Sequence, residues 1–287
     1  MKNYFSLITF SHTVFALPFA LLGFFLATLE VETGFSWRLL LFVLLCMVFA
    51  RSAAMAFNRY LDRDIDEKNP RTAMREIPAG IISPRRALMF VIINASLFII
   101  CTWLINPLCF ALSPVALAVI LGYSYTKRFT FLCHFVLGLG LALAPIGAYL
   151  AAGGGFDLIP ILYSIAVLLW VSGFDIIYAL QDEEFDKSLQ LNSIPVKLGR
   201  KNALLLSSAL HVLSALIILT AGYLLSLRYP QFSWIQWVAA GVYVAMLYYQ
   251  HSLVKPNDLS RVNRAFFTAN GIASVVFGSL MILDIYW

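Results

Sequence analysis

Charged residues are scarce in this sequence. Asp, Glu, Lys and Arg make up 12% of its 287 residues, against about 25% in an ordinary soluble domain. Hydrophobic residues account for 61% of the chain. The composition therefore excludes a water-soluble globular protein and predicts an all-α membrane protein that crosses the bilayer several times.

The sequence also lacks the cysteine and histidine patterns of disulfide frameworks and zinc sites. Its four cysteines are scattered through apolar runs without a CxxC spacing: Cys46, Cys101, Cys109 and Cys133. Its four histidines occur singly, without an HxxH or HExxH pattern: His12, His134, His211 and His251. We interpret the cysteines as small core residues and the histidines as packing or interface residues.

Apolar windows of about 20 residues, long enough to cross a bilayer as a helix, recur along the whole chain. The nine predicted spans lie near 10–29, 38–58, 86–105, 108–124, 131–152, 158–180, 203–226, 233–254 and 264–284. We expect them to form a single transmembrane domain over 1–287, a ring-like bundle with a central cavity open to the cytoplasmic side.

Lysine and arginine predict the orientation of this bundle. They concentrate in the connections after spans two, four, six and eight, whereas the other connections offer only Arg38 and Arg228 at their edges. By the positive-inside rule, the N-terminus and the basic loops face the cytoplasm and the C-terminus lies on the opposite side of a bacterial cytoplasmic membrane. Topology thus explains the net charge of +5, and no nucleic-acid partner is expected.

Two of the cytoplasmic loops resemble each other. After the second span a row of polar residues follows at steps of four: Asn58, Asp62 and Asp66. After the sixth span the same steps recur: Tyr178, Asp182 and Asp186. We therefore expect two related half-bundles, approximately 1–130 and 131–254, with the ninth helix at 264–284 closing the ring.

Residues four apart share one face of a helix, so the aspartates of each row would project together. Crowded carboxylates repel one another unless a cation neutralises them, and hard oxygen ligands suit Mg²⁺, which also binds substrate phosphates. The two rows therefore predict a clamp that holds a diphosphate through Mg²⁺. The basic residues expected to neutralise the phosphates are Arg71, Arg75, Lys127 and Arg128. The acidic residues off the rows are interpreted as solvated loop charges: Asp64, Glu67, Glu76, Glu183 and Glu184.

Two further charges lie inside apolar segments, where a charged side chain costs at least about 2.5 kcal/mol. Asp175 precedes Asp182 by two helical turns, and Arg51 precedes Asn58 by the same distance. Both are functional candidates. Arg51 is either a structural ion-pair or snorkelling residue, or the binding partner of a second, acidic substrate.

These motifs resemble the UbiA-type intramembrane aromatic prenyltransferases. The resemblance rests on NRYLDRDID from Asn58, NPRTAMREIPAG from Asn69, GYSYTKRFT from Gly122 and DIIYALQDEEFDKSLQLNSIPVKLG from Asp175. It covers the whole chain, and it looks most like the 4-hydroxybenzoate polyprenyltransferase branch.

The resemblance implies transfer of a polyprenyl group from its diphosphate to a ring carbon of an aromatic acceptor, with Mg²⁺, in ubiquinone or menaquinone biosynthesis. It implies metal and diphosphate binding by Asn58, Asp62, Asp66, Asp182 and Asp186. Diphosphate contacts are implied for Arg71, Arg75 and Lys127, with Tyr123 in the same loop as Lys127. Arg51 would hold the acceptor carboxylate, and Asp175 or Asp182 would polarise the phenol or accept its proton. The second motif reads QDEEFD rather than a denser aspartate run, which leaves the roles of Glu183 and Glu184 open.

The residues leave alternatives open. Arg51 suits any aromatic carboxylate, so a dihydroxynaphthoate of menaquinone biosynthesis is an alternative acceptor to 4-hydroxybenzoate. A secondary transporter would also combine half-repeats with intramembrane charges, but its ionisable residues belong near the midplane. Here they cluster at the cytoplasmic ends of the spans, which favours the enzyme.

Overall fold

A computed structural model describes residues 2–7, 15–30 and 34–287 of the chain, and these residues are mostly helical. Its helices before the second polar row are α1 (Lys2–Leu7), α2 (Leu17–Ala27), α3 (Trp37–Leu61), α4 (Arg63–Lys68), α5 (Pro84–Ile105), α6 (Pro107–Thr126), α7 (Cys133–Ala151) and α8 (Leu158–Ala179). The remaining helices are η2 (Leu180–Asp182), α9 (Glu183–Ser188), α10 (Ile194–Arg228), α11 (Ile235–Leu253), the π-helical η3 (Arg264–Ala269) and α12 (Asn270–Tyr286).

Each predicted span coincides with helix in the part of the chain that the structure describes. Seven of the described helices are long and apolar enough to cross a membrane. The two other predicted spans correspond to α2, which is short, and to α11, which is long enough but carries Gln236, Gln250 and His251. The start of the first span and His12 lie outside the described residues. The count of nine transmembrane helices and the relation between the half-bundles therefore stay predictions.

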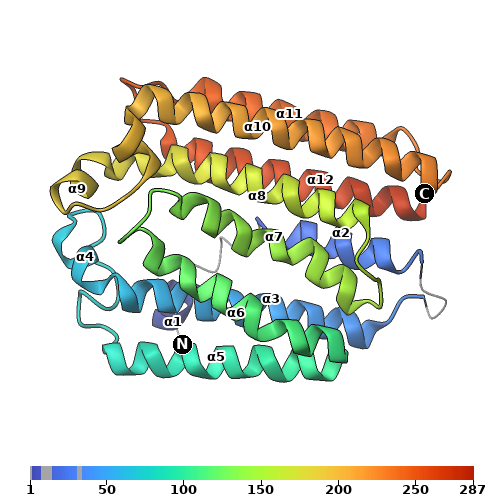
Figure 1. Ribbon diagram of the computed structural model, residues 1–287, viewed down its shortest axis with the longest axis horizontal. Coiled ribbons are helices and arrows are strands. Elements are labelled where there is room, and N and C mark those ends of the chain that lie inside the picture. The colour runs from blue at the N-terminus through green and yellow to red at the C-terminus, as the bar shows by residue number, and fades with distance from the viewer. Residues whose placement is uncertain (1, 8–14, 31–33) are drawn as a thin grey trace.

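Short local signals begin several of the long helices. Ser83 caps α5 by accepting a hydrogen bond from the Arg86 amide, and Asn106 caps α6 in the same way. Each cap is followed at once by a proline, which fits the first helical position because it needs no hydrogen-bond donor there. These signals explain why α5 and α6 form two antiparallel helices with a turn of a single residue between them (Figure 1).

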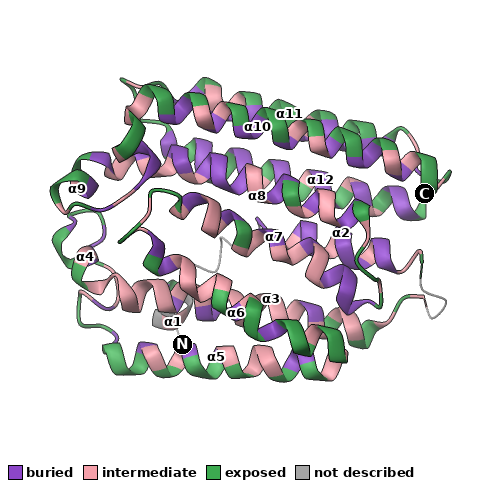
Figure 2. Ribbon diagram, in the orientation of Figure 1, coloured by how far each residue is buried: buried purple, intermediate pink, exposed green. Residues whose placement is uncertain are grey.

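The bundle is organised around α8, which packs against α7 and α10 and is the most buried of the long helices (Figure 2). Trp170 of α8 is fully buried, and its ring centroid lies 5.4 Å from that of Phe19 and 5.2 Å from that of Phe174. Its indole N–H donates to the side-chain oxygen of Asn270, 2.9 Å away. Aromatic burial and a satisfied polar group thus join α2, α8 and α12 in one core.

Glycines allow α2 to approach its neighbours closely. A Cβ at Gly23 would lie 2.1 Å from the carbonyl oxygen of Pro145 in α7. A Cβ at Gly278 in α12 would lie 2.5 Å from the Cβ of Pro18. Neither position admits a larger residue without a shift of backbone, so these two contacts fix α2 between α7 and α12.

At the end of the bundle opposite to α4 and α9, Asp284 of α12 caps α11. Its fully buried carboxylate accepts hydrogen bonds from the amides of Ser233 and Gln236, at 3.1 and 2.9 Å, and from the Ser233 hydroxyl at 2.5 Å. The loop before α11 therefore depends on a carboxylate that lies about 50 residues away in sequence.

We expect Asp284→Ala to lower the free energy of unfolding by about 2–4 kcal/mol, because it leaves buried donors without an acceptor. Thermal unfolding in detergent measures the effect. The matched control is Asp258→Ala, which removes an exposed carboxylate that bonds within its own loop and should cost below about 1 kcal/mol. An unchanged midpoint for Asp284→Ala would contradict the capping role.

Candidate active site

The two aspartate rows lie at the same end of the bundle, where Figure 1 places α4 and α9. Although α3 ends at Leu61, helical hydrogen bonding continues across the break. The Asp62 amide donates to the Asn58 carbonyl at 2.9 Å, and the Asp66 amide donates to the Asp62 carbonyl at 2.7 Å. The Asn58 amide side chain also donates to Asp62 Oδ2 at 3.0 Å. The steps of four therefore keep these side chains together, as the sequence predicts.

The second row meets the first loop directly. Arg71 donates to both oxygens of Asp182, from Nε at 3.1 Å and from Nη2 at 2.6 Å. Asn69 donates to Asp182 Oδ1 at 3.3 Å, and Arg71 Nη1 donates to the Tyr178 hydroxyl at 3.2 Å. A two-pronged arginine–carboxylate pair of this kind orients both groups. It brings together segments that are 111 residues apart in sequence.

Three more ion pairs complete the arrangement. Arg75 Nη1 lies 2.6 Å from Asp66 Oδ1, and Lys127 Nζ lies 2.7 Å from Asp186 Oδ1. The remaining pair joins Arg128 Nη2 to Asp62 Oδ1 at 3.3 Å. Each aspartate of the predicted metal set is thus paired with a different residue of the predicted phosphate-binding set. Acid and base alternate around one small volume.

Two of the row carboxylates are buried and have oxygens of the kind that suits a divalent cation. Asp66 is 5% exposed and Asp186 is 1% exposed. Oδ2 of Asp66 and both oxygens of Asp186 are buried without a hydrogen-bond partner, although Lys127 lies close to Asp186. Buried anionic oxygens without hydrogen bonds are costly and suit a hard cation such as Mg²⁺. While the aspartates are paired in this way, no three acidic, histidine or cysteine side chains among the described residues are arranged so that they could bind one metal ion.

The electrostatics of the loops agree with this interpretation. The pKa of Asp62 is raised to about 6, first by burial and then by the Asp66 carboxylate, against the opposing effect of Lys127 and Arg128. Burial acts to lower the pKa of Lys127, but the carboxylates of Asp186, Asp182 and Asp62 together outweigh burial and raise it. The lysine is therefore charged at neutral pH, and the crowded carboxylates repel each other as the sequence predicts.

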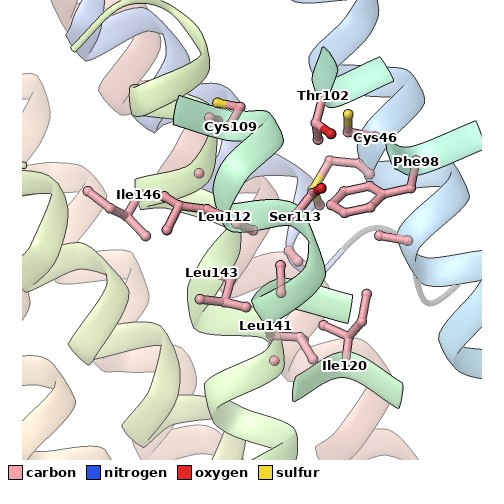
Figure 3. A pocket seen from close by; sticks show the side chains of 18 of the residues that line it. Cys46, Phe98, Thr102, Cys109, Leu112, Ser113, Ile120, Leu141, Leu143 and Ile146 are labelled. Atoms are coloured by element: carbon pink, nitrogen blue, oxygen red, sulfur yellow. The ribbon is translucent and has the colours of Figure 1, made fainter. Parts of the chain in front are cut away.

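Below the loops, a cavity of about 370 Å³ lies between α3, α5, α6 and α7. Arg51 and Tyr123 line it near the aspartate rows. Its α6 wall, from Tyr123 to Cys109, spans about 21 Å at the helical rise per residue. Figure 3 shows that the more distant walls are mainly apolar, with Thr102, Ser113 and the thiols of Cys46 and Cys109 among the side chains.

Arg51 and Asp175 are the two candidate charges that lie inside apolar segments. The Nε atom of Arg51 is buried and has no hydrogen-bond partner among the described residues. Tyr123 interacts electrostatically with Arg51, Asp175 and Asp62. The deep arginine, the deep aspartate and the first aspartate row therefore all act electrostatically on one tyrosine that lines the cavity. Such an arrangement can hold an anionic group on Arg51 while a polyanion occupies the loops.

The acidic residues off the rows have other partners. Asp64 has a side chain that is 61% exposed and lies 3.3 Å from Arg128. Glu183 is buried but accepts hydrogen bonds from Lys187 and Arg200, at 2.6 and 2.7 Å. These bonds join α9 to the start of α10. The Glu184 side chain is 88% exposed and also contacts Arg200, so both glutamates have partners outside the aspartate rows.

The interpretation of His134 as a packing residue is incomplete. This residue is buried in the first turn of α7, and its Nδ1 lies 2.7 Å from Asp175 Oδ2. The available signal was its place inside an apolar span, where an ionisable residue is a functional candidate by default. Asn69 and Tyr178, which contact Arg71 or Asp182, were also missing from the predicted site.

The chain is similar to known proteins over most of its length. The model of the UbiA prenyltransferase family matches residues 16–272. A 4-hydroxybenzoate octaprenyltransferase of Aliivibrio fischeri (strain MJ11) is 31% identical over 246 residues, which cover 84% of this chain and 82% of that protein. The 4-hydroxybenzoate octaprenyltransferase of Aeromonas hydrophila is 30% identical over 246 residues, covering 86% of this chain and 83% of that protein.

Solved structures agree with the sequence relatives. The apo structure of a UbiA homolog from Aeropyrum pernix K1 superposes with a TM-score of 0.82 at 32% identity, covering 95% of this chain and 98% of that one. A UbiA homolog from Archaeoglobus fulgidus, solved with GPP and Mg²⁺ bound, gives a TM-score of 0.76 at 21% identity, covering 99% of this chain and 100% of that one. The second likeness concerns the fold.

Proposed function

Because the chain belongs to the UbiA prenyltransferase family, we propose that it prenylates an aromatic acid in quinone biosynthesis. It transfers a polyprenyl group from polyprenyl diphosphate to a ring carbon of 4-hydroxybenzoate and releases diphosphate. The names of the relatives support this acceptor. The observation that supports the proposal is the set of four ion pairs, in which carboxylates of the kind that suits Mg²⁺ lie beside cations of the kind that suits a diphosphate.

The loops bind the leaving group in this mechanism. Asn58, Asp62, Asp66, Asp182 and Asp186 would hold Mg²⁺, which neutralises diphosphate charge when bound. An incoming diphosphate exchanges the aspartate partners of the basic residues for phosphate oxygens. The basic residues concerned are Arg71, Arg75, Lys127 and Arg128. Their charges stabilise the diphosphate as the allylic C–O bond breaks, so the bond can ionise at neutral pH.

The acceptor binds below the loops. Arg51 holds its carboxylate, and Tyr123 lines the same cavity. The ring carbon ortho to the hydroxyl attacks the allylic carbon, and the ring then loses a proton. Asp175 accepts this proton, because Asp182 belongs to the set of carboxylates that would hold Mg²⁺. The apolar walls keep water from the cationic carbon.

The cavity accommodates the polyprenyl tail. It runs from Arg51 and Tyr123 along α3 and α6 between apolar side chains. Val115 and Phe156 line it and are nevertheless 62% and 66% exposed. In a membrane protein such exposed apolar residues face lipid, so a tail too long for the cavity leaves through this wall into the bilayer. The aspartate rows and the N-terminus would face the cytoplasm, where polyprenyl diphosphate and the acid are supplied.

Product analysis tests the proposed function. Membranes containing the protein would receive polyprenyl diphosphate, Mg²⁺ and equal amounts of 4-hydroxybenzoate and a dihydroxynaphthoate, and mass spectrometry would identify the prenylated ring. Predominant prenylation of 4-hydroxybenzoate supports the proposal. Predominant prenylation of the naphthoate would move the protein to a menaquinone route, since Arg51 suits both acids. Counterflow of a substrate without a covalent product would instead support a transporter.

Gly147→Phe should select against long prenyl tails. Gly147 lines the cavity, and a Cβ at this position would have no heavy atom within 4 Å, so the new ring projects into the cavity. We expect activity with a long polyprenyl diphosphate to fall about 10- to 100-fold, the equivalent of about 1–3 kcal/mol of overpacking. Activity with dimethylallyl diphosphate should fall less than about threefold on the same basis.

The matched control is Gly241→Phe. Gly241 lies on an exposed face of α11, a Cβ there also meets no atom within 4 Å, and the residue is not part of the cavity lining. This variant should treat long and short prenyl diphosphates as the wild type does. Equal losses for both chain lengths in Gly147→Phe would contradict the assignment of the cavity to the tail.

A further inference from the structure

The structure fixes the hydrogen bonds of the buried residue His134. Its Nδ1 lies 2.7 Å from Asp175 Oδ2. Its Nε2 lies 3.3 Å from the backbone nitrogen of Ile194, which donates to it. A ring nitrogen that accepts an N–H carries no proton of its own, so the proton of the neutral imidazole is on Nδ1 and points at Asp175. The two bonds together set the tautomer.

Three helices hold the imidazole in place. His134 is 3% exposed, and the Ser172 hydroxyl of α8 donates to its backbone carbonyl at 3.3 Å. One turn further along α7, a Cβ at Gly138 would lie 2.6 Å from the Leu168 carbonyl oxygen of α8, so the two helices touch through backbone. Ile194 is the first residue of α10. The packing of α7 on α8 therefore fixes the backbone that carries the ring, and the start of α10 bonds the ring itself.

Asp175 has one hydrogen-bond partner among the described residues, and this partner is His134. The bond engages Oδ2. The side chain is 22% exposed, in contrast to 4% for His134, so the carboxylate reaches out of the packed interface. Its charge acts on Tyr123, which lines the cavity together with Arg51. The second oxygen, Oδ1, has no hydrogen-bond partner among the described residues.

We propose that His134 is a positioning residue that holds the Asp175 carboxylate with Oδ1 directed at the acceptor ring. The proposal rests on the proposed function, and it adds the reason why Asp175 can serve as the base. In that reaction the C–O electron pair leaves with the diphosphate and a C–C bond forms to the ring. The ring carbon then gives its proton to Asp175 Oδ1, which restores the aromatic ring and later releases the proton to water.

The same geometry distinguishes a positioning role for His134 from a role in proton transfer. A histidine that relays a proton needs a second nitrogen free to release it. Here the Ile194 amide occupies Nε2, so His134 keeps its Nδ1 proton throughout. Any side chain with one N–H donor for Asp175 and one acceptor for Ile194 should therefore replace it. The primary amide of glutamine carries both groups.

The test compares His134→Leu with His134→Gln in the full-length protein. Leucine fills the space without a donor, and we expect kcat to fall about 100-fold, as for a misplaced catalytic group. The KM for prenyl diphosphate should remain unchanged, since the aspartate rows are not altered. Glutamine should restore kcat to within about fivefold of wild type, because it keeps both hydrogen bonds. With an acceptor deuterated ortho to its hydroxyl, only the leucine variant should show an enlarged isotope effect.

Two results would overturn the proposal: wild-type kcat in His134→Leu, or equal losses in both variants when thermal unfolding shows both folded. The first result would show that turnover does not need the hydrogen bond between His134 and Asp175. The second would show that the imidazole itself is required. A measurement without turnover separates this inference from the proposed function. Nitrogen-15 NMR of labelled histidine in nanodiscs should show the Nδ1–H tautomer of His134 in wild type, assigned by the absence of its signal in His134→Gln. An Nε2–H tautomer in wild type would refute the pairing even if no acceptor were prenylated.

Discussion

Simultaneous Asp66→Asn and Asp186→Asn substitution should lower kcat by at least about 1,000-fold. Removal of one preorganised electrostatic partner commonly costs about 100- to 1,000-fold, and this change removes two of the proposed anionic ligands. Both carboxylates are almost fully buried and have oxygens without hydrogen bonds. Asparagine preserves their volume but not their charge, so the expected loss arises from weaker metal and diphosphate binding rather than from a cavity.

The measurement is prenyl transfer at increasing Mg²⁺ in membranes that contain equal amounts of each protein. A suitable control is the double variant Asp64→Asn and Glu184→Gln, because these side chains are 61% and 88% exposed on the same two loops. The control should retain activity within about threefold, as exposed ion pairs contribute little. The site assignment is wrong if the Asp66 and Asp186 variant keeps a tenth of wild-type activity with an unchanged Mg²⁺ dependence.

Arg51→Leu should remove the preference for an acidic acceptor. Arg51 has a buried Nε without a partner among the described residues, and it lines the cavity. Loss of one member of a buried ion pair costs about 3–5 kcal/mol, which corresponds to about 150- to 5,000-fold in kcat/KM for 4-hydroxybenzoate. With the methyl ester of the same acid, which has no charge to pair, the change should be small.

The experiment compares kcat/KM for the acid and for its methyl ester in wild type and variant. Arg63→Leu is a matched control, because Arg63 lies in α4 and donates to the Tyr60 carbonyl while it covers the Tyr60 ring. This variant should keep the wild-type ratio between acid and ester. If Arg51→Leu also keeps that ratio, Arg51 is a structural residue and the acceptor carboxylate binds elsewhere.

Much of the fold follows from local sequence. Apolar windows locate the helices because a bilayer requires about 20 apolar residues with all backbone groups bonded inside the helix. The steps of four from Asn58 to Asp66 are equally local, and helical bonding across Asp62 keeps these residues together. The boundaries of α5 and α6 follow from a cap and a proline at each start.

Partnerships between distant segments are not local. The sequence by itself determined the helices, the two aspartate rows and the class of ligand that such rows suit. Only the tertiary structure decided that Arg71 pairs with Asp182, that Glu183 turns to Arg200, and that His134 holds Asp175. The physical reason is that helical periodicity fixes the face on which a side chain lies, whereas the packing of α7 and α10 on α8 fixes what that face meets.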